Sequence, residues 1–124
     1  RGSGTLLVVE DDKAVRQLML TSLGEQGYRT IAASHGGEAL VRFAEAGGAV
    51  DLVVTDVVMP EMGGPELVSR LHETHPGLKV LFISGYAEDR IVHHGVVEPG
   101  HELLPKPFLP GQLLARVQAL LAQN

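Results

Sequence analysis

The chain has 124 residues, a size typical of one compact domain. Ten Lys and Arg residues against fifteen Asp and Glu residues give a formal net charge of −5, which disfavours direct binding to nucleic acid or to an anionic membrane. The absence of cysteine excludes disulfides, thiol nucleophiles and thiolate metal sites. No apolar run is long enough to cross a membrane and no signal-like segment is present, so we expect a cytoplasmic protein. Residues 1–4 look like a remnant of cloning, which leaves residues 5–124 as a single predicted domain.

The first part of the chain alternates between strand and helix patterns. Leu6–Val9 is a continuous apolar run, typical of a strand that is buried on both faces. Apolar residues then recur at helical spacing over Lys13–Gln26, and Gly27 suits the left-handed position that ends a helix. Tyr28–Ala33 is a less apolar strand pattern, which favours a place near the edge of a sheet.

The same alternation continues to the end of the chain. The remaining predicted elements are, in order, a helix after Ser34 that ends at Gly47–Gly48, a strand at Leu52–Thr55, a helix with Pro65 in its first turn that ends at His75, a strand at Val80–Ile83, a short helix over Glu88–Val97, a strand at Leu103–Leu104 and a helix from Pro110. Five strands alternating with five helices predict an α/β domain with one five-stranded parallel sheet. Such sheets bind ligands beyond the carboxyl ends of their strands.

Polar residues that could do chemistry follow four of the predicted strands. They are Glu10, Asp11 and Asp12 after the first strand, Asp56 after the third, Ser84 after the fourth and Lys106 after the fifth. Taken singly, each has a structural reading as a helix cap, a turn residue or a solvated charge. Taken together, they predict one site in which the repulsion between carboxylates is relieved by a hard cation, and oxygen ligands suit Mg²⁺.

Four segments then resemble the receiver domain of two-component response regulators. They are Val8–Asp12, Thr55–Gly64, Ser84–Tyr86 and Lys106–Phe108, and the resemblance runs from Thr5 to about Leu121. It implies that residues 5–124 form a receiver domain. It also implies a flavodoxin-like sheet with strand order 2-1-3-4-5, for which one member of this family is a standard example.

The resemblance also implies a role for each residue of the site. Asp56 would be the phosphoacceptor, supplied by a phosphohistidine on a histidine kinase or a histidine phosphotransfer protein. Asp11 and Asp56 would bind Mg²⁺ directly, Glu10 would act through a water molecule, and the backbone carbonyl of Val58 would complete the protein ligands. Lys106, after a cis peptide bond to Pro107, would pair with the phosphoryl oxygens, and Ser84 would donate a hydrogen bond to them.

The output of such a domain is a change in its partner-binding face. The resemblance implies that Ser84 moves toward the phosphoryl group and that the fourth helix, fifth strand and fifth helix form that face, which would bind a downstream effector or a kinase domain. The switch position in the fifth strand, often aromatic in the family, is Leu103 here, so coupling through an aromatic rotamer is in doubt. Val58 and Tyr86 flank the path of hydrolytic water, and neither is an acid or an amide, so we expect slow loss of the phosphoryl group.

Three further questions concern the class of protein. The Ser84–Tyr86 loop, together with Ile91–Gly95 and Glu98–Gly100, resembles receivers fused to hybrid sensor histidine kinases, so we favour a fragment of such a kinase over a free-standing regulator. A phosphatase of the haloacid-dehalogenase type needs a second Asp where this chain has Val58, and a flavodoxin-like FMN carrier needs a glycine-rich phosphate loop where this chain has three acids. We therefore expect a stoichiometric phosphoacceptor and no turnover enzyme, with no nucleic acid, membrane or obligate oligomer as partner.

Overall fold

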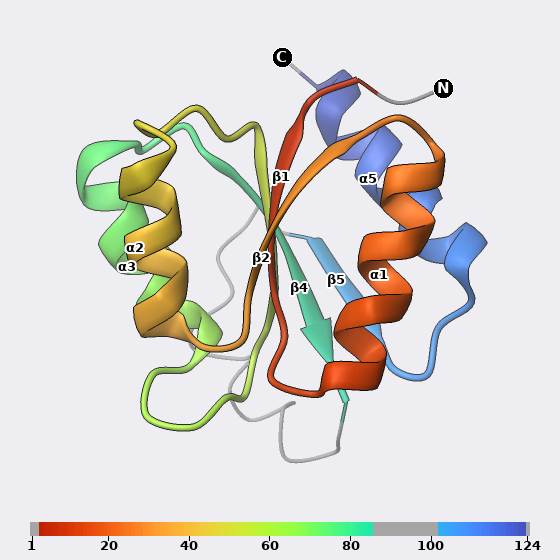
Figure 1. Cartoon of the computed structure of the whole chain (residues 1–124), viewed down its shortest axis with the longest axis horizontal. Coiled ribbons are helices and arrows are strands. Elements are labelled where there is room, and N and C mark those ends of the chain that lie inside the picture. The colour runs from red at the N-terminus through yellow and green to blue at the C-terminus, as the bar shows by residue number, and fades with distance from the viewer. Residues whose placement is uncertain (1–2, 86–101, 124) are drawn as a thin grey trace.

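The computed structural model describes residues 3–85 and 102–123, and in this part of the chain a sheet lies between two pairs of helices (Figure 1). The strands are β1 (Thr5–Val9), β2 (Arg29–Ala33), β3 (Leu52–Asp56), β4 (Lys79–Ser84) and β5 (Glu102–Pro105). The helices are α1 (Lys13–Glu25), α2 (Gly36–Glu45), α3 (Gly64–Thr74) and α5 (Pro110–Ala122). The helix that the sequence predicts over Glu88–Val97 lies outside the described residues.

The five strands form one parallel sheet in the order β2-β1-β3-β4-β5, which confirms the predicted α/β fold class and strand order. Each strand of the interior is almost wholly buried: only the first residue of β1 and of β4 is partly exposed, and β3 is buried throughout. In β2, at one edge, only Ala33 is buried. The hydrophobicity of each strand in the sequence therefore follows its place in the sheet.

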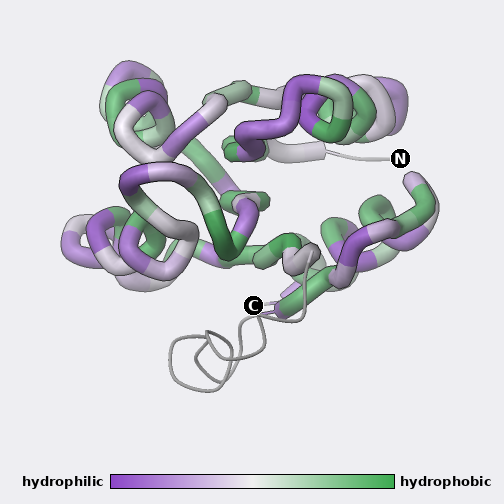
Figure 2. Tube along the Cα trace, turned by 90° about the horizontal axis from the view of Figure 1, so that it is seen from below, coloured by the Kyte–Doolittle hydropathy of each residue, from purple (hydrophilic) through white to green (hydrophobic). Residues whose placement is uncertain are grey.

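The core consists of two main apolar layers, one on each face of the sheet. Helices α1 and α5 cover one face, and α2 and α3 cover the other (Figure 1). Because β1 directs alternate side chains to the two faces, Leu6 and Val8 pack in the first layer, and Leu7 and Val9 pack in the second. Figure 2 shows the hydrophobic strands in the middle and helices of mixed polarity outside them.

Local signals set the ends of the helices. The Asp12 side chain caps α1 by accepting a hydrogen bond from the Val15 amide at 3.0 Å. Gly27 follows α1 with a φ of 96°, a conformation that side chains disfavour. Pro65 occupies the first turn of α3, where its missing amide hydrogen costs nothing. Among the described helices, none combines the length and the apolar character that crossing a membrane requires.

The parallel register brings the ends of distant segments to one edge of the sheet. Val9 pairs with Thr55, and Asp56 pairs with Ile83. Ser84 pairs with Pro105, the last residue of β5. Lys106 follows Pro105 and therefore lies at the same edge of the sheet as Ser84. The carboxyl ends of the strands, at the lower edge in Figure 1, therefore carry the residues that the sequence singles out for chemistry.

Candidate functional site

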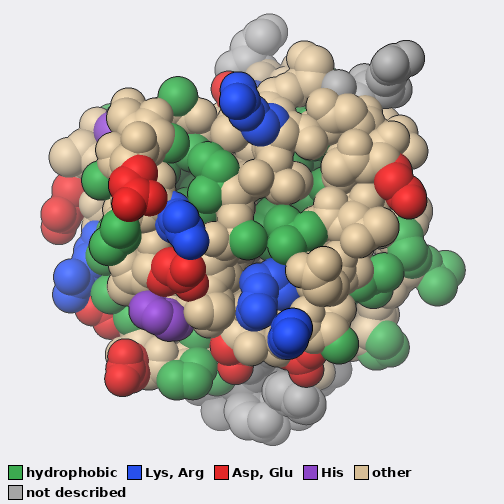
Figure 3. Space-filling view, viewed as in Figure 1, with side chains coloured by type: hydrophobic (Ala, Val, Ile, Leu, Met, Phe, Trp, Pro, Cys, Tyr) green, Lys and Arg blue, Asp and Glu red, His purple; other side chains and the backbone are tan. Residues whose placement is uncertain are grey.

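A cluster of charged side chains lies at the carboxyl edge of the sheet. Lys106 Nζ is 3.2 Å from Glu10 Oε1 and 3.2 Å from Asp56 Oδ1. Glu10 is fully buried, and Asp56 is 4% exposed. One carboxylate oxygen from each of Glu10, Asp11 and Asp56 lies within 4.8 Å of the others. On the face seen in Figure 3, Lys and Arg side chains lie beside Asp and Glu side chains at this lower edge. Three acids and one lysine from three strand ends therefore share one site.

The cluster forms part of an open cavity of about 400 Å³. The described residues that line it are Glu10, Asp11, Asp12, Asp56, Val58, Met59, Pro60, Ile83, Gly85 and Lys106. Five of the seven site residues named from the sequence thus lie around this cavity, and the other two, Ser84 and Leu103, do not line it. The space suits a small ligand with access from solvent.

The turn between β1 and α1 holds the first two acids. The Asp12 amide donates a hydrogen bond to Glu10 Oε2 at 3.0 Å. The Glu10 amide donates to the Ala33 carbonyl at 3.1 Å, which continues the β1–β2 pairing by one residue. Arg16, a residue that the sequence analysis did not single out, donates from Nη1 to the Glu10 carbonyl at 2.8 Å. The only feature of the sequence that could have predicted this contact is the position of Arg16, one helical turn after Asp12.

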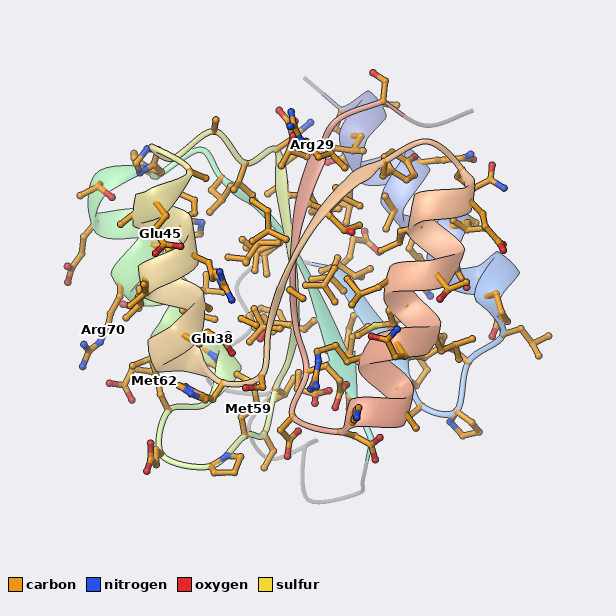
Figure 4. The ribbon with its side chains drawn as sticks, viewed as in Figure 1. Arg29, Glu38, Glu45, Met59, Met62 and Arg70 are labelled. Atoms are coloured by element: carbon orange, nitrogen blue, oxygen red, sulfur yellow. The ribbon has the colours of Figure 1, made fainter. Side chains whose placement is uncertain are left out.

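The loop after β3 fixes Asp56. The Gly64 amide donates to the Val57 carbonyl at 2.8 Å, which closes the loop onto the strand end. The Thr55 hydroxyl lies 3.1 Å from the Asp56 carbonyl and donates to it. In Figure 4, Met59 and Met62 lie in this loop, below the first turns of α2. The close approach of Gly64 to the strand end could not be predicted, because in the sequence Gly63-Gly64 stands out only as part of a motif.

The short strand β5 ends at Pro105 and places the next residue, Lys106, beside the cavity. The Lys106 amide donates to the Ser84 carbonyl, with 2.6 Å between nitrogen and oxygen, so the two neighbouring strand ends are joined. The Lys106–Pro107 peptide bond is cis, as the resemblance implies. Ser84 itself is buried, at 7% exposure, beside this bond. The hydrogen bond from the Lys106 amide ties the backbone of Ser84 to that of Lys106, which lines the cavity.

The electrostatics of the cluster follow from burial and from crowding of like charges. Burial, and then the neighbouring Glu10 carboxyl, raise the pKa of Asp56 to about 9, although Lys106 acts in the opposite direction. Burial alone would lower the pKa of the Lys106 ammonium, but the charges of Asp56 and Glu10 outweigh it, and the net shift is upward. Without a further cation, the site therefore favours a proton on Asp56 and a charge on Lys106.

The residues can hold a divalent cation. Glu10 Oε1 is buried and receives no well-formed hydrogen bond from any described residue, although Lys106 Nζ is 3.2 Å away. A buried carboxylate oxygen without a donor is costly, and a metal ion would satisfy it. The donor set is made of oxygen alone, which fits a hard cation.

The remaining predicted residues lie around the site or outside the described part. The Val58 side chain is 56% exposed at the mouth of the cavity. Leu103 is half-buried and packs against a small apolar cluster of Val57, Val68, Val80 and Phe82, away from the cavity. Tyr86, Ile91–Gly95 and Glu98–Gly100 lie outside the described residues.

Comparison with known proteins gives consistent matches over the whole domain. Residues 6–118 match the family described as "Response regulator receiver domain". The chain is 47% identical to the Sensor kinase CckA of Brucella abortus (strain 2308) over 123 residues, which are 99% of this chain and 13% of that protein. It is 33% identical over 116 residues to the Response regulator receiver protein CpdR of the same organism, with coverage of 94% and 95%. The crystal structure of the receiver domain from the hybrid histidine kinase CckA superposes with a TM-score of 0.80 and 34% identity, and covers 95% of this chain and 99% of that one.

Proposed function

This chain belongs to the response regulator receiver domain family, and on that premise we propose that Asp56 is the residue that accepts a phosphoryl group. The observation that carries this assignment is the position of its carboxylate. It lies in a solvent-accessible cavity, 3.2 Å from the Lys106 ammonium and within 4.8 Å of two further carboxylates. A nucleophilic oxygen, a cation for the incoming oxygens and a metal-binding set are what phosphoryl transfer to a carboxylate requires.

Mg²⁺ would be held by the carboxylates of Glu10, Asp11 and Asp56 and by the backbone carbonyl of Val58, which lines the same cavity. When bound, the ion supplies positive charge that offsets the repulsion among the acids and the phosphoryl oxygens. The oxygen-only donor set and the unsatisfied Oε1 atom of Glu10 support this choice of cofactor.

The transfer step uses the chain's own groups. A carboxylate oxygen of Asp56 attacks phosphorus, the O–P bond forms as the N–P bond of a phosphohistidine breaks, and the released imidazole takes up a proton from solvent. The Lys106 ammonium pairs with the phosphoryl oxygens from its place beside Asp56. Once Asp56 is phosphorylated, the Ser84 hydroxyl, at the end of the neighbouring strand β4, donates a hydrogen bond to a phosphoryl oxygen. Each event phosphorylates one Asp56, so the domain is a stoichiometric acceptor and not a turnover enzyme.

The new charge is read out on the face formed by β5 and α5. A phosphoryl group adds up to two negative charges at the strand ends, and Ser84 responds to them. The Arg116 guanidinium of α5 donates to the Leu103 carbonyl of β5, so a shift of β5 is transmitted to α5. The helix predicted over Glu88–Val97 completes this face in our proposal and lies outside the described residues.

We further propose that the domain is part of a hybrid sensor histidine kinase. The 47% identity to a sensor kinase supports this context, although the chain spans only 13% of that relative's length. A free-standing regulator is the alternative, because the chain also matches 95% of the length of CpdR. In either case, a histidine kinase or a histidine phosphotransfer protein supplies the phosphoryl group in the cytoplasm, and an effector or a kinase domain reads the result.

A small phosphodonor tests the acceptor assignment without a partner protein. Incubation with acetyl phosphate and Mg²⁺, followed by intact-mass measurement, should show one added phosphoryl group on the wild type and none on Asp56→Asn. The matched control is Asp51→Asn, because Asp51 precedes the same strand at the opposite edge of the sheet. Loss of phosphorylation in the control, or its retention in Asp56→Asn, would refute the assignment.

A further inference from the structure

The first turns of α1 place two basic side chains next to the acidic turn, and the structure treats them differently. Lys13 is exposed at the start of the helix. Arg16 is partly buried, and its Nη1 atom donates a hydrogen bond to the backbone carbonyl of Glu10 at 2.8 Å. The two residues carry the same charge at the same edge of the sheet, but only Arg16 is bonded to the segment that holds the acids.

The Arg16 side chain is bonded to the first residue of the acidic turn, Glu10. The Arg16 backbone amide donates to the Asp12 carbonyl at 2.9 Å, which is the ordinary helical bond that begins α1 at the other end of the turn. Asp11, between these two residues, is exposed, and its side chain forms no hydrogen bond or ion pair with the described part of the chain. The position of the Asp11 carboxylate therefore depends on the neighbouring backbone, which Arg16 holds.

Arg16 donates to a backbone carbonyl and not to the carboxylates of Glu10 or Asp11. Among the described residues, no acid forms an ion pair with the Arg16 guanidinium within 4.0 Å. An ion pair would occupy an oxygen of Glu10 or Asp11 that a cation could otherwise use. By donating to the backbone instead, Arg16 fixes the turn and itself occupies no carboxylate oxygen of Glu10 or Asp11. The rigid guanidinium suits such a directed bond better than a flexible ammonium.

We propose that Arg16 is a positioning residue for divalent-cation binding: its bond to the Glu10 carbonyl holds the Glu10–Asp12 turn in the geometry that presents Glu10 and Asp11 to the ion. This inference rests on the proposed function, because it assigns a support to the metal site used there. Groups that orient metal ligands from the second layer commonly change metal affinity by about 10- to 100-fold.

Simple electrostatics predicts the opposite change in Mg²⁺ affinity when Arg16 is replaced, and this difference makes the inference testable. Removing a positive charge near a cation site should tighten cation binding, because the repulsion between the two falls. Loss of a positioning bond should weaken it. Arg16→Met keeps much of the aliphatic stem but removes the donors, so we expect its Kd for Mg²⁺ to rise about 10-fold. Lys13→Met removes the same charge without removing a bond, so its Kd should stay unchanged or fall.

The experiment is a titration of each full chain with MgCl₂, monitored by ¹H–¹⁵N NMR chemical shifts, together with thermal unfolding in EDTA and in MgCl₂. Arg16→Lys keeps the positive charge and an N–H donor group, and should recover a large part of the lost affinity. An Arg16→Met protein that binds Mg²⁺ as tightly as the wild type, or more tightly, would overturn the proposal. If Arg16→Met fails to fold, Arg16→Gln replaces it under the same criterion.

Failure of the proposed function is distinguishable in the same data. If the wild type neither binds Mg²⁺ nor takes a phosphoryl group from acetyl phosphate, the function and this inference fall together. If the wild type does both, and Arg16→Met matches its Kd, only the role of Arg16 is refuted. An equal fall in unfolding temperature with and without Mg²⁺, at unchanged Kd, would indicate a purely structural role and would also refute the proposal.

Discussion

The α-carbon of Gly64 lies so close to the strand end that a side-chain carbon there would be 2.1 Å from the carbonyl oxygen of Asp56. No such contact is tolerated, so Gly64→Ala must displace either α3 or the end of β3. We expect the free energy of unfolding to fall by about 1–3 kcal/mol, the usual cost of overpacking, together with slower phosphorylation of Asp56. Chemical denaturation and intact-mass measurement would test both effects.

The control for this substitution is Gly24→Ala in α1. A side-chain carbon at Gly24 would meet nothing within 4 Å, and its helical backbone favours Ala. This variant should therefore gain about 0.5–1 kcal/mol in the free energy of unfolding. If Gly64→Ala had the same free energy of unfolding as Gly24→Ala, the close approach of Gly64 to the Asp56 carbonyl would be refuted.

The raised pKa of Asp56 predicts a pH dependence of stability in the metal-free protein. Between the ordinary value of 3.8 and the folded value of about 9, the folded state binds one proton more than the unfolded state. The free energy of unfolding therefore falls as the pH rises through this window. Denaturation in EDTA at a series of pH values measures the slope. Asp56→Asn should have a shallower slope, and an identical one would contradict the assignment.

Lys106 is expected to hold the pKa of Asp56 below the value that burial and Glu10 would otherwise impose. Lys106→Met should therefore raise that pKa further, since the nearest positive charge is lost. ¹³C NMR of the carboxyl carbons during a pH titration without metal measures the change. Lys79→Met, at the opposite end of β4, should leave the titration of Asp56 unaltered. A downward shift in Lys106→Met would count against the ion pair.

The exposed Val58 side chain predicts a long-lived phosphoryl group, because it offers no group that could orient water for attack. Val58→Asn introduces an amide at the mouth of the cavity and should shorten the lifetime severalfold. The measurement is the decay of phosphorylated protein after the phosphodonor is removed. Val41→Asn is a matched control, since Val41 is also 56% exposed but lies on α2. Equal decay in both variants would argue that Val58 has no part in hydrolysis.

Leu103 belongs to an apolar cluster and not to the charged site, so Leu103→Ala should weaken the fold and spare the chemistry. We expect a loss of about 1–2 kcal/mol in the free energy of unfolding, because the side chain is only half-buried. Leu104→Ala, at a buried neighbour, should cost about 2–5 kcal/mol. Both variants should still accept a phosphoryl group at Asp56. A folded Leu103→Ala protein that accepts none would show that Leu103 contributes to the site itself.

Periodicity predicted most of the fold because each element has a distinct apolar pattern. The interior strands are nearly continuous apolar runs, and β2, at the edge, is more polar, so the composition of a strand indicates its place in the sheet. The strand order came from a resemblance, since no pattern within a strand specifies its neighbours. A helix end was predicted where a single residue sets it, as Gly27 does for α1.

The chemistry of the strand ends was also predicted from the sequence, because parallel strands must end at one edge and polar residues follow four of them. What the sequence could not supply is distance. The equal 3.2 Å separations of Lys106 from Glu10 and Asp56 depend on the register between β4 and β5. The bond from Arg16 to the Glu10 carbonyl depends on how α1 lies against β1.

The order of residues therefore determined which elements form and which groups meet at one edge of the sheet. Apolar periodicity is a local property of the chain, and strands that alternate with helices run parallel, so their carboxyl ends lie together. The tertiary structure alone decided how strongly those groups interact. Charge repulsion, burial and hydrogen bonding vary steeply over a few ångströms, and those ångströms are set by packing between segments far apart in sequence. The pKa of Asp56 is the clearest case, because it is raised by burial and by Glu10, a residue 46 positions away along the chain.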